Sequence, residues 1–219
     1  LVSASKLRSS LTRKMYSDKL WILYNMETYV QGQGSGNPTI PEKRAYMDIK
    51  TFKYQGVVVG VMFGGYNGSP LDDTWLIVPG YGDQGIAWVR FHKRTVDTPY
   101  PSERNSYAMA SFNDGVIMTG GIRDSGGPHE TWFFHCKEQD SKISKLDMLQ
   151  KLQENCQWHQ IIQNDRDTPY GQIHYQKLAS IASNNVLVFD WKDPKRSCTW
   201  IFEKTTGNNV DISKSGQWK

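Results

Sequence analysis

The sequence lacks any apolar stretch that approaches the length needed to cross a bilayer, which excludes a membrane span. No apolar run follows Leu1 to Ser5 either, so a signal peptide is not apparent. The chain begins without methionine and ends abruptly at Gln217-Trp218-Lys219. We therefore expect a piece processed or excised from a longer polypeptide, for which a missing signal peptide says little about compartment.

The motifs that usually carry catalysis are missing as well. There is no G-x-S-x-G elbow, no phosphate-binding G-x-x-x-x-G-K-[ST] loop and no H-E-x-x-H pair. The glycine cluster from Gly32 to Gly36 precedes Asn37-Pro38 instead of a helical pattern, which predicts a flexible connector. The five histidines show no spacing that would gather them. We therefore predict a protein that is not an enzyme and binds no cofactor.

Acidic residues are absent from residues 1–16, which carry Lys6, Arg8, Arg13 and Lys14. The net charge of +4 therefore comes from this segment, and the rest of the chain is close to neutral. A neutral body lacks the positive field that binding to a phosphate backbone requires. The pattern predicts a basic leader or linker over residues 1–18 and argues against a nucleic-acid partner.

Aromatic residues and glycine are plentiful, with 8 Trp, 11 Tyr and 19 Gly in 219 residues. Short strands, many turns and large anchoring rings fit this mixture, which favours an all-β fold. Internal repetition supports the same interpretation. A Thr-Trp pair followed by apolar residues occurs three times, at Thr74-Trp75, Thr131-Trp132 and Thr199-Trp200, and a weaker copy surrounds Trp21.

Further features recur in the same order around each Thr-Trp pair. An apolar strand precedes the pairs at residues 57–63, 116–118 and 186–189, and a second tryptophan follows them at Trp88, Trp158 and Trp218. The first two apolar strands end in Gly64-Gly65 and Gly120-Gly121, whereas the third has Asp190-Trp191 there. The tetrapeptide Asp-Thr-Pro-Tyr occurs at residues 97–100 and 167–170, and Pro41 and Arg44 match Pro101 and Arg104.

This ordered set resembles the repeat of kelch (galactose oxidase-like) β-propellers, whose period is roughly 50 residues. The resemblance covers residues 19–219. It implies an all-β propeller with three complete four-stranded blades and part of a fourth. Because an open arc would leave strand edges bare, we expect another segment or chain to complete the ring. Regularly spaced tryptophans then fill the wedge between neighbouring sheets, and the glycines permit backbone that other residues disfavour.

The resemblance also implies a function, namely a non-catalytic module that binds a protein through loops at one end of the blades. The loops between the second and third strands (residues 66–72, 122–130 and 192–197) and between blades mix aromatic and charged side chains. The residues expected to bind a partner are Arg44, Tyr66, Asn67, Tyr100, Arg104, Arg123, Asp124, His129, Tyr170 and Gln172. We expect a protein partner, for which an acidic peptide and another fragment that completes the ring are the candidates. In a second interpretation Arg44 and Arg104 brace neighbouring loops through backbone carbonyls. The alternative function is a galactose oxidase-like or glycan-binding extracellular domain.

Two of the three cysteines, Cys136 and Cys156, close the third strand and open the fourth strand of one repeat. Opposite positions in such a hairpin predict a disulfide. The alternative is a zinc site that adds His135 and His159, although neighbouring strand residues point to opposite faces. Ile143, Leu146, Leu149 and Leu152 between the cysteines indicate a short amphipathic helix, and Cys198 is left without an assigned role.

The compartment follows from two features. A disulfide between Cys136 and Cys156 and the N-glycosylation sequon Asn67-Gly68-Ser69 both favour an extracellular protein. Because most kelch proteins are intracellular, a cytoplasmic location is the alternative.

Overall fold

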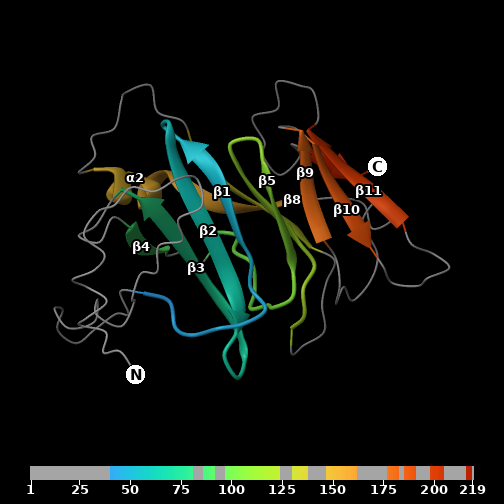
Figure 1. Ribbon diagram of the computed structural model, residues 1–219, viewed down its shortest axis with the longest axis horizontal. Helices are drawn as coiled ribbons and strands as arrows, with labels where there is room; N and C mark the ends of the chain where they lie inside the picture. Colours follow the sequence, from blue (N-terminus) through green and yellow to red (C-terminus); the bar gives the residue numbers. More distant parts are fainter. Residues whose placement is uncertain are drawn as a thin grey trace, which may run out of the picture. The chain divides into compact units, whose positions relative to one another are not determined.

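The computed structural model describes residues 40–80, 86–91, 97–123, 130–137, 147–161, 177–182, 185–190, 198–204 and 216–218 (Figure 1). The chain divides into Leu1–Gln33 and Gly34–Lys219, and every described residue belongs to the second unit. The predicted leader over residues 1–18 and the weak repeat around Trp21 lie outside the described residues.

The described residues form three four-stranded antiparallel sheets and one helix, so they are mostly β, and the all-β expectation is confirmed in this coarser form. Sheet 1 contains β1 (Ile49–Tyr54), β2 (Val57–Tyr66), β3 (Pro70–Pro79) and β4 (Ile86–Phe91). Sheet 2 contains β5 (Ala108–Phe112), β6 (Gly115–Thr119), β7 (Thr131–Cys136) and β8 (Cys156–Ile161). Sheet 3 contains β9 (Lys177–Ala182), β10 (Asn185–Asp190), β11 (Cys198–Lys204) and β12 (Gly216–Trp218). In each sheet, neighbours along the chain pair with each other, which Figure 1 lets the reader follow by colour.

Local sequence explains how these strands form. The strand β2 is rich in β-branched residues and is buried on both faces over most of its length, as its near-continuous apolar sequence predicts. It is joined to β1 by Gln55-Gly56, both with positive φ (50° and 79°). Two positive φ values are the type I′ turn geometry that matches the twist of a tight hairpin. The strand β2 also runs through to Tyr66 and pairs with Pro70. The loop expected over residues 66–72 is therefore shorter than predicted and comprises only residues 67–69.

The three Thr-Trp pairs occupy equivalent positions in the three sheets. Trp75, Trp132 and Trp200 each lie on the third strand, opposite Met62, Met118 and Val188 of the second strand. Two residues further on, the third strand is paired with the second tryptophan of its repeat, so that Trp88, Trp158 and Trp218 are also equivalent. The repeat identified in the sequence is therefore a structural repeat of the sheet.

Apolar side chains pack between sheets on opposite faces of sheet 2. The larger cluster joins Phe63 and Leu76 of sheet 1 to Phe134 and Trp158 of sheet 2. The smaller cluster joins the other face of sheet 2, including Phe133, to sheet 3. By register, the residue pair Val116 and Phe134 of sheet 2 corresponds to Val186 and Phe202 of sheet 3. Val116 and Phe134 pack against sheet 1, and Val186 and Phe202 pack against sheet 2. Sheets 2 and 3 therefore pack the same face against the sheet that precedes each of them in the chain.

The first strands of the three sheets are neighbours, since β5 contacts both β1 and β9. A hydroxyl group links each first strand to the one before it. Ser111 Oγ donates to the Thr51 carbonyl at 2.6 Å, and Ser180 Oγ donates to the Ser111 carbonyl. Thr51, Ser111 and Ser180 occupy equivalent positions in their sheets. They pair with Gly60, Val116 and Val186 of the second strand, which are themselves equivalent. The same short polar contact therefore recurs from sheet to sheet.

The double glycines have the role predicted from the sequence in the first two sheets. Gly64 has φ of 49°, and a Cβ there would lie 2.5 Å from the Arg104 carbonyl oxygen and 2.6 Å from that of Leu71. Gly120 is in the same position of sheet 2 with φ of 70°. Positive φ and close backbone approach both exclude larger residues here. The third sheet has Asp190 at this position, at the end of β10.

The predicted disulfide between Cys136 and Cys156 is present, and the two cysteines face each other across β7 and β8. The predicted helix is α2 (Met148–Asn155), which buries Met148 and Leu152 and ends directly at β8. Ile143 and Leu146 lie outside the described residues. Within the part of the chain that is described, no helix has both the length and the apolar character to span a membrane.

Candidate protein-binding surface

Arg44 lies among groups of its own chain at the end of sheet 1 where β2 turns into β3. Its guanidinium forms a two-pronged ion pair with Asp73, donating from Nη2 to Oδ2 at 2.9 Å and from Nη1 to Oδ1. Nη1 also donates to the Gly64 carbonyl at 3.0 Å. Trp75 Nε1 donates to the same carboxylate at 2.7 Å. We call Arg44, Asp73 and Trp75 the Arg44 cluster.

Arg104 makes the equivalent contacts in sheet 2. Its Nη2 donates to Glu130 Oε2 at 2.7 Å, and its Nη1 donates to the Gly120 carbonyl at 3.1 Å. Trp132 Nε1 donates to Glu130 Oε2 at 3.0 Å. The Arg104 side chain is only 1% exposed. We call Arg104, Glu130 and Trp132 the Arg104 cluster, and its guanidinium is enclosed by its own chain.

The second interpretation of Arg44 and Arg104, in which they brace loops through backbone carbonyls, thus matches their positions. Each guanidinium is nearly fully buried and satisfied by an acid and a glycine carbonyl. A partner could bind these groups only by displacing internal contacts of a desolvated charge, which costs several kcal/mol. Arg123 reaches the outer side of the Arg104 cluster, with Nη2 3.2 Å from Glu130 Oε2. These three arginines therefore gather at the loop end but are engaged within the chain.

The two acids stay charged because of these partners. Burial alone would raise the pKa of Glu130, but hydrogen bonds from Arg104 and Trp132 and the attraction of Arg104 and Arg123 outweigh it. The pKa of Glu130 is therefore lowered. The pKa of Asp73 is lowered in the same way, with Arg44 and Trp75 outweighing burial. Sequence reasoning did not single out either acid, although both lie two residues before their tryptophan, and that shared spacing could have identified them.

Tyr100 was expected to bind a partner but turns toward the core. Its hydroxyl forms a 2.6 Å hydrogen bond with Thr74 Oγ1, and its ring packs on Phe63. Thr74 also accepts a 2.9 Å bond from Trp158 Nε1, so it links sheet 1 to sheet 2. Burial, opposed by the hydrogen bond with Thr74, raises the pKa of Tyr100. The position of the ring indicates a structural role for the Asp-Thr-Pro-Tyr motif.

Four predicted residues, Asp124, His129, Tyr170 and Gln172, lie outside the described residues. In sheet 3, Cys198 pairs with Asp190 and lies two residues before Trp200, the position at which the first two sheets have Asp73 and Glu130.

The exposed apolar groups at this end of sheet 1 include Ile49 and also Tyr46, Met47 and Tyr66; we call the last three the tyrosine surface. Tyr46 is 68% exposed and Tyr66 is 40% exposed. Tyr66 lies opposite Ala45, with hydrogen bonds between their backbones in both directions at 2.9 Å. A Cβ on Gly65 would lie 3.1 Å from the Met47 Cβ, which shows how closely the two segments approach. The backbone segments that carry these three exposed side chains therefore lie side by side.

The backbone under the tyrosine surface is held firmly although its side chains are exposed. The Tyr46 carbonyl accepts a 2.9 Å hydrogen bond from the Ser106 amide, which ties it to the next repeat. Tyr46 has φ of 56°, and Ser106 has the same left-handed conformation in sheet 2 with φ of 54°. Such a conformation is unusual for a bulky residue and is found at functional sites. Tyr66 was predicted from the sequence, whereas Tyr46 was missed because nothing local marks an exposed tyrosine.

Asn67, the remaining predicted residue, is exposed at the turn between β2 and β3. Its Nδ2 donates to Glu42 Oε2 at 2.8 Å, and its amide donates to the Ser69 carbonyl at 3.2 Å. Asn67 follows Tyr66 directly, so the turn borders the tyrosine surface.

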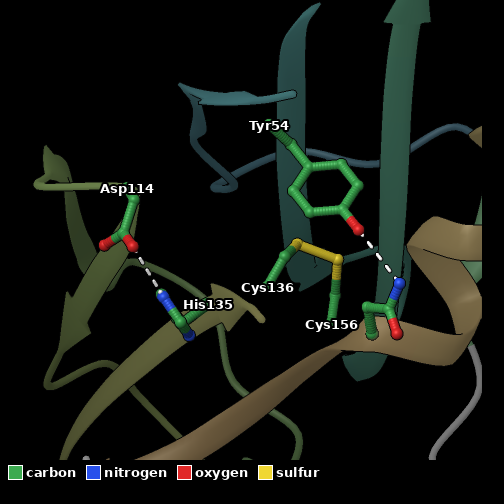
Figure 2. The surroundings of a disulfide bond; sticks show 6 residues. Tyr54, Asp114, His135, Cys136 and Cys156 are labelled. Carbon is green, nitrogen blue, oxygen red and sulfur yellow. Dashed lines mark hydrogen bonds and ion pairs between the residues drawn. A yellow bond between two sulfur atoms is a disulfide. The ribbon is translucent and has the colours of Figure 1, made fainter. Parts of the chain in front are cut away.

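The described residues around the disulfide form no exposed surface comparable to the tyrosine surface. Both cysteines are buried, and Tyr54 lies next to them with its hydroxyl accepting a 3.0 Å bond from Asn155 (Figure 2). His135 points to the other side of β7, where Nε2 lies 2.7 Å from Asp114 Oδ2 (Figure 2). The disulfide removes the two thiolates that a zinc site would need. The described residues contain no group of three or more histidine, cysteine or acidic side chains placed to hold a metal.

No protein-family model matches the chain, and no curated protein matches it in sequence.

Proposed function

We propose that the chain is a non-catalytic protein-interaction module of the kelch-propeller type, which binds its partner through the tyrosine surface. The observation that carries this proposal is the exposed pair Tyr46 and Tyr66 on backbone that is tied to both sheet 1 and sheet 2. Rigid aromatic side chains lose little conformational entropy when they become buried, and tyrosine is enriched among residues that dominate binding energy. A preorganised surface also avoids the cost of ordering a loop during binding.

Three features support the propeller architecture. The three sheets repeat the same register, and sheets 2 and 3 pack the same face toward the preceding sheet. The first strands β1, β5 and β9 are neighbours in chain order. In a propeller the sheets surround a central channel, so one edge strand of every sheet meets its counterparts there. Sheet 1 carries the matching row of Gly60, Ile77 and Trp88, which would receive a preceding blade.

The proposed surface differs from the sequence-based expectation in its composition. It retains Tyr66 and adds Tyr46 and Met47, while the guanidiniums of Arg44 and Arg104 support the loops from inside. Each guanidinium holds a glycine carbonyl and an acid in place, which fixes the loop end of its sheet. The arginines thus contribute to binding by positioning the surface.

Site-specific photocrosslinking tests the proposal. A benzophenone amino acid replaces Tyr46 in one variant and Val58 in the control, because Val58 is also exposed (44%) but lies at the opposite end of β2. In an extract of the source organism we expect a discrete protein adduct from position 46 and none from position 58. Excess unlabelled chain should compete for this adduct, and the same chain carrying Y46A and Y66A should not. Equal adducts at both positions, or equal competition by the double variant, would contradict the proposal.

An oxidase assay after copper loading separates this function from the galactose oxidase-like alternative. Stoichiometric copper with turnover of a primary alcohol would favour the oxidase, and we expect neither.

A further inference from the structure

The structure assigns a modification site that borders the proposed partner surface but whose assignment does not rest on it. We infer that Asn67 accepts an N-linked glycan. The chain contains one N-x-S/T sequon without proline at its centre, at Asn67-Gly68-Ser69. A second Asn-x-Thr triplet, Asn37-Pro38-Thr39, has proline at the central position, which blocks transfer. The sequence therefore contains both a candidate acceptor and an internal negative control.

Asn67 lies where a glycan can be carried without disturbing the fold. Residues 67–69 are all exposed and form the turn between β2 and β3. Gly68 has φ of 120°, and a Cβ added there would meet no atom within 4 Å, so the turn is open on that side. Glycans require such surface turns because they are bulky and strongly hydrated.

The hydrogen bonding of Asn67 is compatible with the modification. The side-chain amide has two N–H groups, and one of them is sufficient for the 2.8 Å bond to Glu42 Oε2. Glycosylation replaces one N–H hydrogen by a sugar carbon and keeps the other. The bond to Glu42 can therefore persist in the modified protein and hold the first sugar in a fixed direction.

The transfer itself needs a co-reactant of defined class, an oligosaccharide linked to a lipid diphosphate, and the transferase that uses it. The bond between sugar C1 and the diphosphate oxygen breaks, and a bond between C1 and Asn67 Nδ2 forms. The lipid diphosphate leaves, and the amide proton passes to a base of the transferase. No group is oxidised or reduced.

The Cys136–Cys156 disulfide is an independent sign of the compartment in which this transfer occurs. Disulfides form and persist in the oxidising secretory pathway, where N-glycans are also attached. The disulfide and the glycan on Asn67 are therefore both expected of a chain that passes through the secretory pathway. In this assignment Asn67 carries a glycan next to Tyr66 and does not itself contact a protein partner.

The experiment expresses the whole 219-residue chain behind a cleavable signal peptide in a eukaryotic secretion host. Mass spectrometry of the secreted, non-reduced protein should show a glycan on Asn67 and an intact disulfide. A peptide N-glycosidase should remove the glycan and convert Asn67 to aspartate. N67Q and S69A should each abolish the glycan, and S69T should retain it, which distinguishes sequon recognition from a change in folding.

The P38A variant provides the matched control, since it turns Asn37-Pro38-Thr39 into a second acceptable sequon. We expect glycan on both Asn37 and Asn67 in this variant. A secreted, disulfide-bonded wild-type chain without glycan on Asn67 would overturn the inference. Glycan on Asn37 of P38A in that case would show that the transferase reached the chain and passed over Asn67.

Discussion

Replacing Arg104 by methionine should destabilise the chain far more than an ordinary surface substitution. The Arg104 side chain is 1% exposed and donates to Ser102, Gly120 and Glu130. Methionine fills similar space but leaves the Glu130 carboxylate without its main partner and the Gly120 carbonyl without a side-chain donor. Breaking a buried ion pair by removing one partner costs about 3–5 kcal/mol. Because Glu130 keeps its bond from Trp132, we expect a loss of about 3 kcal/mol.

Urea unfolding followed by tryptophan fluorescence measures this loss as a change in the free energy of unfolding. Lys50→Ala is the matched control, since the Lys50–Asp48 ion pair is 32% and 37% exposed in its two side chains. Exposed pairs contribute at most about 1 kcal/mol, so this variant should unfold almost as wild type does.

A double-mutant cycle with Glu130→Gln then isolates the pair. We expect a coupling energy of about 2 kcal/mol between Arg104 and Glu130, because contacting charged groups couple at this scale. If Arg104→Met costs no more than Lys50→Ala, or the coupling energy is zero, Arg104 does not hold the loop end of sheet 2. The assigned role of Arg44 would then also fail, since it rests on the same geometry.

Three further outcomes follow from the described contacts. Because the pKa of Glu130 is lowered in the folded chain, its charged form stabilises the fold above the unfolded pKa of 4.5. This contribution is lost as the pH falls through the folded pKa. Glu130→Gln should therefore flatten the acid-side loss of stability in thermal melts recorded over a series of pH values. Replacing both Cys136 and Cys156 by alanine removes a 20-residue covalent loop and should lower the free energy of unfolding by about 3 kcal/mol, whereas adding reductant to this variant should change nothing more. Trp158→Phe keeps a ring in the core but loses the bond to Thr74, so we expect a cost of about 1–2 kcal/mol in urea unfolding, and the additional change Thr74→Val should cost less in this background than in wild type.

The repeated sheet could be predicted from the sequence because its signals are local and recur in order. Each Thr-Trp pair follows an apolar strand, and the register places all three tryptophans at equivalent positions. The disulfide was predictable for the same reason, since a hairpin brings the end of one strand opposite the start of the next.

Side-chain direction at the loop end could not be predicted in the same way. The sequence allows Arg44 and Arg104 either to bind a partner or to brace neighbouring loops, and only the three-dimensional proximity of Asp73 and Glu130 shows that they are internal. Tyr100 resembles an exposed aromatic residue until the neighbouring Thr74 and Phe63 are placed beside it. Tyr46 has the reverse character, because it is exposed in a left-handed backbone conformation that no motif in the sequence indicates.

The packing of sheets 2 and 3 gives the repeat a direction. Trp158 of sheet 2 donates a hydrogen bond to Thr74 of the preceding sheet. The two faces of sheet 2 carry different apolar residues, so they are not interchangeable. A row built by this rule has a donor end and a receptor end, as in any head-to-tail association. We therefore expect an additional sheet, from this chain or from another, to join in one orientation, and a hydrogen bond from its tryptophan to a threonine of the neighbouring sheet would distinguish a correct neighbour from an inverted one.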